Sequence, residues 1–310
     1  MKTQKTQLTP QMFEPAELGL REQEKISGPP VGFWSDSWGR LKKNRGALVS
    51  GVIILLLVVT AFVGPMLTQF GPYEQDLTRQ FVDPFSSNHW FGTDNFGRDL
   101  WARVWEGTQI TLFIAVFAAL LDLMIGVAWG AVSAYFGGRT DDVMQRVVEI
   151  LVGIPNLVIV ILAMLALGTG AASLIIALAL TGWVTMSRIV RGKVLQLKEQ
   201  EFFLASRSLG ASGGRLMLRH LLPNSLGVII VNLMLTIPTA IFFEAFLSFI
   251  GLGIQPPDAS LGSLISEGYN QLRFNPFLLW IPSIVFCLLM ICFNMLGDGL
   301  RDAFDPKMRR

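Results

Sequence analysis

Acidic residues inside long apolar stretches are the chemically most informative feature of the sequence. Asp122, Glu149 and Glu244 lie within or at the edge of such stretches. A charged side chain at the centre of a membrane costs roughly 3 kcal/mol, so we expect these side chains to face protein. Asp122 and Glu244 either line a polar translocation path or bond to a neighbouring helix, and both interpretations stay open. Glu149 also lies close enough to Arg146 to form an exposed ion pair.

Residue patterns for hydrolytic chemistry are missing from the sequence. It has no Gly-x-x-x-x-Gly-Lys-Ser/Thr loop to hold a nucleotide, no His-Glu-x-x-His for zinc and no Gly-x-Ser-x-Gly nucleophile. The two cysteines, Cys287 and Cys292, lie in an apolar stretch, and the two histidines, His89 and His220, are far apart. We therefore predict a protein that is not an enzyme, with no metal, no cofactor and no disulfide framework of its own.

The composition and the apolar stretches together predict a membrane protein. Of the 310 residues, 52% are hydrophobic and 15% are charged, whereas soluble proteins have roughly 25% charged residues. The net charge of +2 gives no basic surface for nucleic acid. A membrane span needs about 20 apolar residues. We predict an all-α polytopic protein with six membrane spans, at residues 47–67, 110–136, 147–167, 173–186, 226–250 and 277–296. The fourth stretch is short for a span, and extending it to 171–190 gives it a sufficient length.

The positions of Lys and Arg predict the orientation of these spans. Of the 25 Lys and Arg residues, only four lie in segments on the opposite side of the membrane from the two chain termini. These four are Arg79, Arg98, Arg103 and Arg273. Because positive residues in short loops stay in the cytoplasm, we expect both termini there. We expect kinks or local opening at Pro155 and Pro238, which lie inside the third and fifth spans.

The segments outside the spans divide the chain further. Residues 1–46 are polar and predict a peripheral cytoplasmic arm, and residues 301–310 a cytoplasmic tail. Residues 68–108 form a long extracytoplasmic loop, and 251–275 form a second one rich in Gly and Pro. A permease-like core with five spans occupies 109–300 and contains an inner loop at 191–223.

The inner loop contains the most distinctive cytoplasmic sequence, at 199–224. Gly210 suits the left-handed conformation that closes a helix ending at Leu209, and Ser212 can cap the next helix, which Pro223 should stop or bend. In the second helix, basic and apolar residues are mixed, with Arg215, Arg219 and His220 among Leu216, Met217, Leu218 and Leu221. This pattern suits insertion into a groove on a protein, and a basic helix lying on anionic lipid is the alternative. Binding of DNA by this turn is disfavoured.

This segment resembles the cytoplasmic coupling loop of ABC-importer permeases. Gly210, Leu222 and Pro223 occupy matching positions and Ala205 takes the place of the first alanine of the pattern, whereas Leu204, Ser206 and His220 depart from it. The resemblance implies a type I importer architecture with coupling helices. The residues that it assigns to contact with the ATPase are Ala205, Ser206, Gly210, Arg215, Arg219 and Pro223.

A second resemblance lies in the first long loop and is more specific. Residues 89–99 are similar to the His-x-x-Gly-Thr-Asp-x-x-Gly-Arg-Asp signature of the C-type subunit of oligopeptide and dipeptide permeases, and residues 294–306 resemble the end of that subunit. We expect a glycine-rich turn with paired charges, structural rather than ligand-binding. Its signature residues are His89, Gly92, Thr93, Asp94, Gly97, Arg98 and Asp99.

These resemblances imply a function and a set of partners. The chain would form half of the translocation path of an ATP-driven peptide importer in the bacterial cytoplasmic membrane. Its partners would be a B-type permease, two ATPase subunits that bind ATP and Mg, and an extracytoplasmic peptide-binding protein. A permease for nickel or another small solute shares these motifs and is the first alternative. A stand-alone secondary transporter is disfavoured because the sequence shows no convincing internal repeat.

Overall fold

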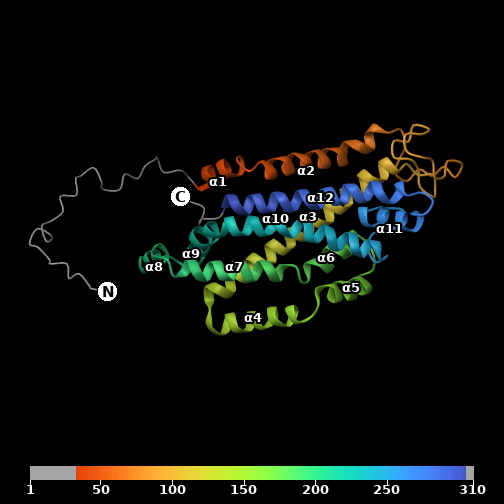
Figure 1. Ribbon diagram of the computed structural model, residues 1–310. Helices are drawn as coiled ribbons and strands as arrows, with labels where there is room; N and C mark the ends of the chain where they lie inside the picture. Colours follow the sequence, from red (N-terminus) through yellow and green to blue (C-terminus); the bar gives the residue numbers. More distant parts are fainter. Residues whose placement is uncertain (1–32, 305–310) are drawn as a thin grey trace, which may run out of the picture.

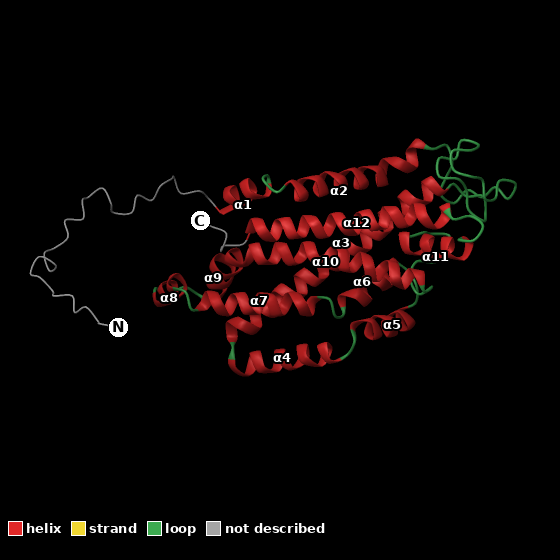
Figure 2. Cartoon of the chain, in the orientation of Figure 1, coloured by secondary structure: helices red, strands yellow, loops and turns green. Residues whose placement is uncertain are grey.

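The computed structural model describes residues 33–304, and this part of the chain is an elongated helical bundle (Figures 1 and 2). Long loops gather at one end, which we call the loop end. The short helices α8 and α9 lie at the other, which we call the hairpin end, together with α1 and the last turns of α12 (Figure 1). The all-α architecture predicted from the sequence is confirmed for the described residues.

Five helical segments are long and apolar enough to cross a membrane, and a bent helix pair brings the number to six. The first two segments are α2 (Arg45–Val63) with the short helix η2 (Gly64–Leu67), and α3 (Leu100–Phe136). The third consists of α6 (Ala171–Ala179) and α7 (Trp183–Lys198), with a break at 180–182. The fourth runs from α9 (Gly213–Leu216) through the π-helical turn η3 (Met217–Leu221) to α10 (Leu222–Phe249), and the fifth is α12 (Phe277–Phe304).

The predicted third span, 147–167, is not one continuous helix. Its residues belong to α4 (Gly138–Gly153) and α5 (Asn156–Leu167), whose axes differ by 87°. Ile154 is extended, with φ −102° and ψ 129°, because the residue before a proline is pushed out of the helical region. The predicted kink at Pro155 is therefore a complete break. In contrast, α10 continues as a helix through Pro238.

Helix α3 begins ten residues before the apolar stretch that predicted it. The Asp99 side chain accepts a hydrogen bond from the Ala102 N–H at 2.9 Å and so caps the first turn. The early turns carry polar side chains, among them Arg103 and Thr108, that are buried by other elements of the loop end. Hydropathy alone misses such a start because the burial of these residues is a tertiary effect.

Two segments predicted without secondary structure contain helices. Residues 33–41 of the predicted arm form α1 (Phe33–Leu41), and Asn44 caps α2 by accepting from the Ala47 N–H at 3.1 Å. The second long loop contains α11 (Leu261–Gln271), which begins with a reciprocal capping box between Ser260 and Ser263. The remainder of the predicted arm, 1–32, and residues 305–310 of the tail lie outside the described residues.

Helices α3 and α7 pack with their backbones unusually close. A β-carbon at Gly130 of α3 would lie 2.3 Å from the Ser187 carbonyl oxygen of α7, a distance that real β-carbons do not reach. Small residues allow this kind of approach between membrane helices. The contact joins the last third of α3 to the start of α7, and both helices contribute to a buried apolar cluster.

We predict that Gly130→Ala destabilises the protein by about 1–3 kcal/mol, the usual cost of overpacking, because the two backbones must separate. Thermal stability of the purified protein in detergent is the measurement. Gly192→Ala on α7 is the control, since a β-carbon there meets nothing within 4 Å. Equal stability of the two variants would contradict the close packing.

Candidate functional site

The hairpin end presents a compact helix-turn-helix at residues 201–221. Helix α8 (Glu201–Ser208) ends in a Schellman arrangement, in which the Ala211 N–H bonds to the Ser206 carbonyl at 3.1 Å and the Gly210 N–H to the Arg207 carbonyl at 3.0 Å. Gly210 has φ +82°. The prediction that Gly210 closes the helix is confirmed.

One local prediction for this hairpin is wrong, and another is wrong in part. Ser212 stands at the N-cap of α9, yet its side chain makes no capping hydrogen bond. Pro223 does not stop the second helix, because α9, η3 and α10 follow one another without a gap and Pro223 lies in the first turn of α10. A bend at Pro223, the other expected outcome, stays a prediction. The π-turn η3 joins α9 to α10, so the hairpin continues directly into a membrane-length helix.

One aromatic side chain anchors the hairpin to the bundle. Phe203 of α8 is 2% exposed and packs in a buried cluster with residues from α3, α7 and α10. The other face is open, with Leu209 89% and Leu218 70% exposed. Of the residues predicted to contact an ATPase, Ser206 is half-buried and donates its hydroxyl to the Phe202 carbonyl, and the others are exposed, namely Ala205, Gly210, Arg215, Arg219 and Pro223. The hairpin is therefore a surface with apolar and basic side chains on a rigid anchor.

A charged contact that the sequence did not predict joins α7 to the start of α4. Arg191 makes a bidentate ion pair with Asp141, at 2.7 and 2.6 Å. Lys198 donates to the Ala134 and Tyr135 carbonyls at the end of α3, at 2.8 and 3.0 Å. These bonds satisfy carbonyls that a helix end leaves unpaired, and they fix the α3–α4 turn against the helix that leads to the hairpin.

At the loop end, the signature residues 89–99 fold into one buried unit. Asp94 accepts from the Phe96 N–H at 2.8 Å, the Arg98 N–H at 3.0 Å and Arg98 Nε at 2.6 Å. His89 Nδ1 lies 2.8 Å from Asp99, the residue that caps α3. Such bonds to ionised groups are roughly twice as strong as neutral ones.

The remaining signature residues hold neighbouring segments of this loop close together. The Thr93 hydroxyl accepts from the Val82 N–H at 2.8 Å and donates to the Arg79 carbonyl at 2.5 Å. Gly97 has φ +71°, and a β-carbon there would lie 1.8 Å from the Asp76 carbonyl oxygen. Gly92 is similarly confined by the Val82 carbonyl. The structure thus brings all seven predicted residues together, and each contributes to the fold of the loop.

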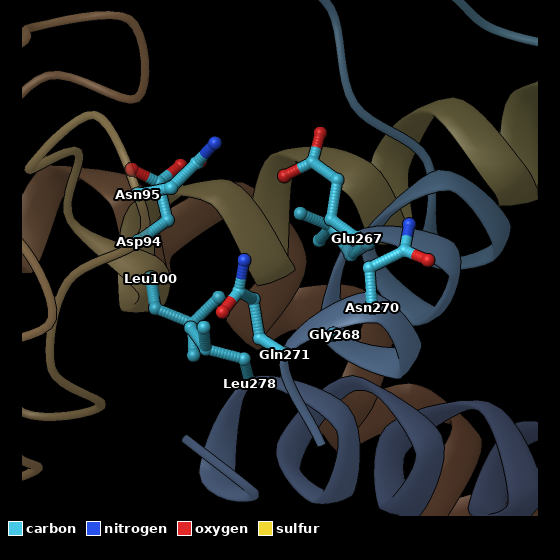
Figure 3. Close-up of a pocket in the computed structure, with 9 residues that line it drawn as sticks. Asp94, Asn95, Leu100, Glu267, Gly268, Asn270, Gln271 and Leu278 are labelled. Carbon is cyan, nitrogen blue, oxygen red and sulfur yellow. The ribbon is translucent and has the colours of Figure 1, made fainter. Parts of the chain in front are cut away.

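Two charged residues that sequence reasoning missed complete this unit. Arg103, fully buried on α3, places Nη2 3.2 Å from Glu267 on α11 and Nε 3.4 Å from Asp94. Figure 3 shows Asp94 and Asn95 of the loop facing Glu267, Asn270 and Gln271 of α11 across a cavity of about 220 Å³. The ion pairs tie the long loop to the start of α3 and to α11.

A second polar contact joins the loop end on its other side. The Tyr73 hydroxyl lies 2.6 Å from Glu106 and 2.9 Å from Asp258, so residues of both long loops meet on α3. Partial burial and the two carboxylates raise the pKa of Tyr73 above its ordinary value. Tyr73 therefore stays protonated at neutral pH and can donate one hydrogen bond between the two acids.

The two acidic residues predicted inside spans have different surroundings, although both are buried. Glu244 accepts from the Thr111 hydroxyl and from the Ser248 hydroxyl, each at 2.8 Å, and so links α3 to α10. Asp122 instead borders a cavity of about 250 Å³, and its Oδ1 has no hydrogen-bond partner among the described residues. Within residues 33–304, no group of three His, Cys, Asp or Glu residues is arranged to hold a metal ion.

Comparison with known proteins places this geometry in a family. Residues 123–310 match the family model described as "Binding-protein-dependent transport system inner membrane component", and residues 32–84 match "N-terminal TM domain of oligopeptide transport permease C". The chain is 47% identical over 299 residues to the oligopeptide transport system permease protein OppC of Bacillus subtilis, covering 96% of this chain and 98% of that protein.

Two further relatives and one solved structure agree with this match. The dipeptide transport system permease protein DppC of Bacillus subtilis is 48% identical, covering 94% of this chain and 91% of the relative. OppC of Escherichia coli K12 is 40% identical, with coverages of 92% and 95%. An inward-facing structure of the MetNI methionine ABC transporter matches with a TM-score of 0.53 at 19% identity, covering 64% of this chain and 94% of that one, and supports the fold alone.

We predict that Asp94→Ala destabilises the protein by about 3–5 kcal/mol, because it leaves the buried Arg98 and Arg103 without their shared carboxylate. Thermal unfolding of the purified protein in detergent measures the loss. Asp83→Ala removes an exposed carboxylate from the same loop and is the control. If both variants unfold at the wild-type temperature, Asp94 does not hold the loop end together.

Proposed function

We propose that this chain, which belongs to the family of binding-protein-dependent transport system inner membrane components, is the C-type permease subunit of an ATP-driven importer of oligopeptides or dipeptides. Its relatives at 40–48% identity are named as oligopeptide and dipeptide permeases, which favours peptide over nickel or another small solute. The single structural observation that carries the proposal is the exposed, firmly anchored hairpin at the end of the bundle.

The membrane orientation follows from the charges. The hairpin end contains Arg207, Arg215 and Arg219 on the exposed hairpin, and we place it in the cytoplasm under the positive-inside rule. The loop end then faces the outside, where Arg98 and Arg103 are paired within the protein. Both termini lie on the cytoplasmic side in this arrangement, as the sequence predicts.

The proposed partners are those implied by the resemblance to ABC importers. Two separate ATPase subunits bind ATP and Mg and dock on the hairpin, and this sequence has no nucleotide-binding loop of its own. A B-type permease covers one side of the bundle and forms the other half of the translocation path. A peptide-binding protein delivers the substrate to the loops at the outer end.

Coupling proceeds mechanically in this proposal. Closure of the ATPases pushes on α8 and the start of α9, and the buried contacts of Phe203 pass the push to α7 and α3. Because a close-packed interior transmits displacement, the helices rock together as a rigid body. The path to the outside then closes while the path to the cytoplasm opens, or the reverse.

We predict that Gly210→Val uncouples ATP hydrolysis from peptide uptake. A side chain in the left-handed conformation costs about 1–2 kcal/mol, and the turn relieves this strain by moving α8. Uptake and ATP hydrolysis by the complete importer in proteoliposomes are the measurements, and uptake per ATP hydrolysed should fall severalfold.

The control for this test is Gly168→Val. Gly168 has φ +84° and ψ 177°, a region that is essentially restricted to glycine, and a β-carbon there meets nothing within 4 Å. The backbone strain of a valine is therefore at least as large there as at Gly210, but Gly168 lies between α5 and α6, away from the hairpin. We expect this variant to keep the wild-type ratio of uptake to hydrolysis. Wild-type coupling in Gly210→Val would count against the hairpin as the coupling element.

A further inference from the structure

The cavity beside Asp122 lies where four helical segments meet in the middle of the bundle. Asp122 is near the centre of the apolar stretch 110–136 of α3, and the other walls come from α5, the α6–α7 break and α10. Part of the cavity wall consists of polar side chains, which are unusual in the middle of membrane-spanning helices. These residues are Asn156, Thr181, Thr185, Asn232, Thr236 and Thr239.

Asp122 lines the cavity, and one oxygen of its carboxylate lacks a hydrogen-bond partner among the described residues. The residue is 5% exposed, and Oδ1 is buried without a hydrogen bond within residues 33–304. A β-carbon on Gly182 would lie 2.0 Å from Oδ2, so the absence of a side chain at Gly182 makes room for the carboxylate. A buried polar atom without a partner is costly and calls for an explanation such as a ligand.

Two interruptions of helical structure border the same cavity. The α6–α7 break contains Thr181 and Gly182, and Asn156 begins α5 just after the break at Pro155. The Thr181 hydroxyl donates to Asn156 Oδ1, so the two breaks are joined. Irregular backbone at membrane depth is tolerated where it lines a cavity, and transporter substrate sites are built from discontinuous helices.

The charges of the residues that line the cavity indicate the charge of a ligand that would fit it. Among the described residues that line the cavity, Asp122 is acidic and none is Lys or Arg. Glu244, the other acid of the membrane region, is already bonded to Thr111 and Ser248. A cation that also donates hydrogen bonds to hydroxyl and amide oxygens would complement this lining.

The volume of the cavity limits the size of the group that it can hold. Its volume of about 250 Å³ is below the roughly 300–1,000 Å³ of pockets that enclose a whole ligand. It thus suits one end of a longer molecule. Every unmodified peptide, whatever its sequence, has a cationic amino group with three donors at one end.

We propose that Asp122 and the polar side chains around it form a subsite for the N-terminal ammonium group of a peptide in transit. This inference rests on the proposed function, because it takes peptides as the transported class. It adds a sequence-independent contact, and the variable side chains of the peptide stay outside the subsite.

The test is uptake by the complete importer in proteoliposomes, with trialanine and with propionyl-dialanine, which lacks only the amino group. We expect Asp122→Asn to lower trialanine uptake about tenfold, as loss of a charged hydrogen bond predicts, and to leave propionyl-dialanine uptake unchanged. Any preference of the peptide-binding protein for one of the two peptides cancels, because the uptake of each peptide is compared between the wild-type chain and Asp122→Asn. Glu149→Gln, which removes an exposed carboxylate from α4, is the control and should behave as wild type.

The outcomes separate this inference from the proposed function. Wild-type importer that takes up no peptide at all contradicts the proposed function. Normal wild-type uptake with an equal loss of both peptides in Asp122→Asn overturns the subsite and leaves the importer standing. Gly182→Ala displaces the carboxylate without removing it, and we expect the same selective loss of trialanine uptake.

A labelling experiment decides the matter if the importer admits too little propionyl-dialanine to measure. In a chain with Cys287 and Cys292 replaced, Thr185→Cys introduces a thiol on the cavity wall. Trialanine should slow its modification by a thiol reagent in the ATP-driven importer. Protection should be lost when Asp122→Asn is added, and unchanged protection would overturn the proposal.

Discussion

The close backbone contact between α3 and α7 is the constraint on which both ends of the bundle depend. Helix α3 begins at the Asp99 cap in the loop end and reaches Phe136 at the hairpin end. Helix α7 leads from the cavity beside Asp122 toward α8. Because Gly130 admits the Ser187 carbonyl so closely, the two helices cannot slide or separate without losing their packing. The pair acts as a stiff link between the hairpin and the long loops.

The buried acidic side chains differ in whether their carboxylates are hydrogen-bonded within the protein. Asp94 accepts hydrogen bonds from backbone and side-chain donors of its own loop. Glu244 accepts from Thr111 and Ser248 and so joins α3 to α10. Their burial is offset by those bonds. Asp122 is buried without such compensation, beside a cavity at two helix breaks. In the proposed importer this difference separates the acids that hold the bundle together from the one that meets the substrate.

The sequence predicted the elements that depend on local chemistry. Apolar stretches located the membrane-length helices, and the glycine at 210 located the end of α8 because few other residues adopt its φ of +82°. The sequence predicts a kink or local opening at Pro155, but not the angle of 87° between α4 and α5. The signature at 89–99 identified a structural turn because its glycines and charges are close in sequence.

The features that the sequence did not predict depend on tertiary contacts. Arg103 and Glu267 are separated by 164 residues, and Asp141 and Arg191 by 50, so no local pattern connects them. The polar first turns of α3 are helical because the loop end buries them, which hydropathy does not register. Helix α11 was not predicted because it lies in a loop that is rich in Gly and Pro. The only local signal of its start is the capping box that begins at Ser260.

The most direct measurement of the stiff link is a distance between its two ends by pulsed electron paramagnetic resonance. Spin labels at Leu209 of the hairpin and Phe85 of the long loop, both highly exposed, would be placed in a chain without its native cysteines and assembled with its partners. If α3 and α7 form a stiff link, the distance distribution between the two labels is the same without nucleotide and with ATP trapped, while distances from either label to the partner permease shift. A clear change of the distance between the two labels would show that the link is not stiff.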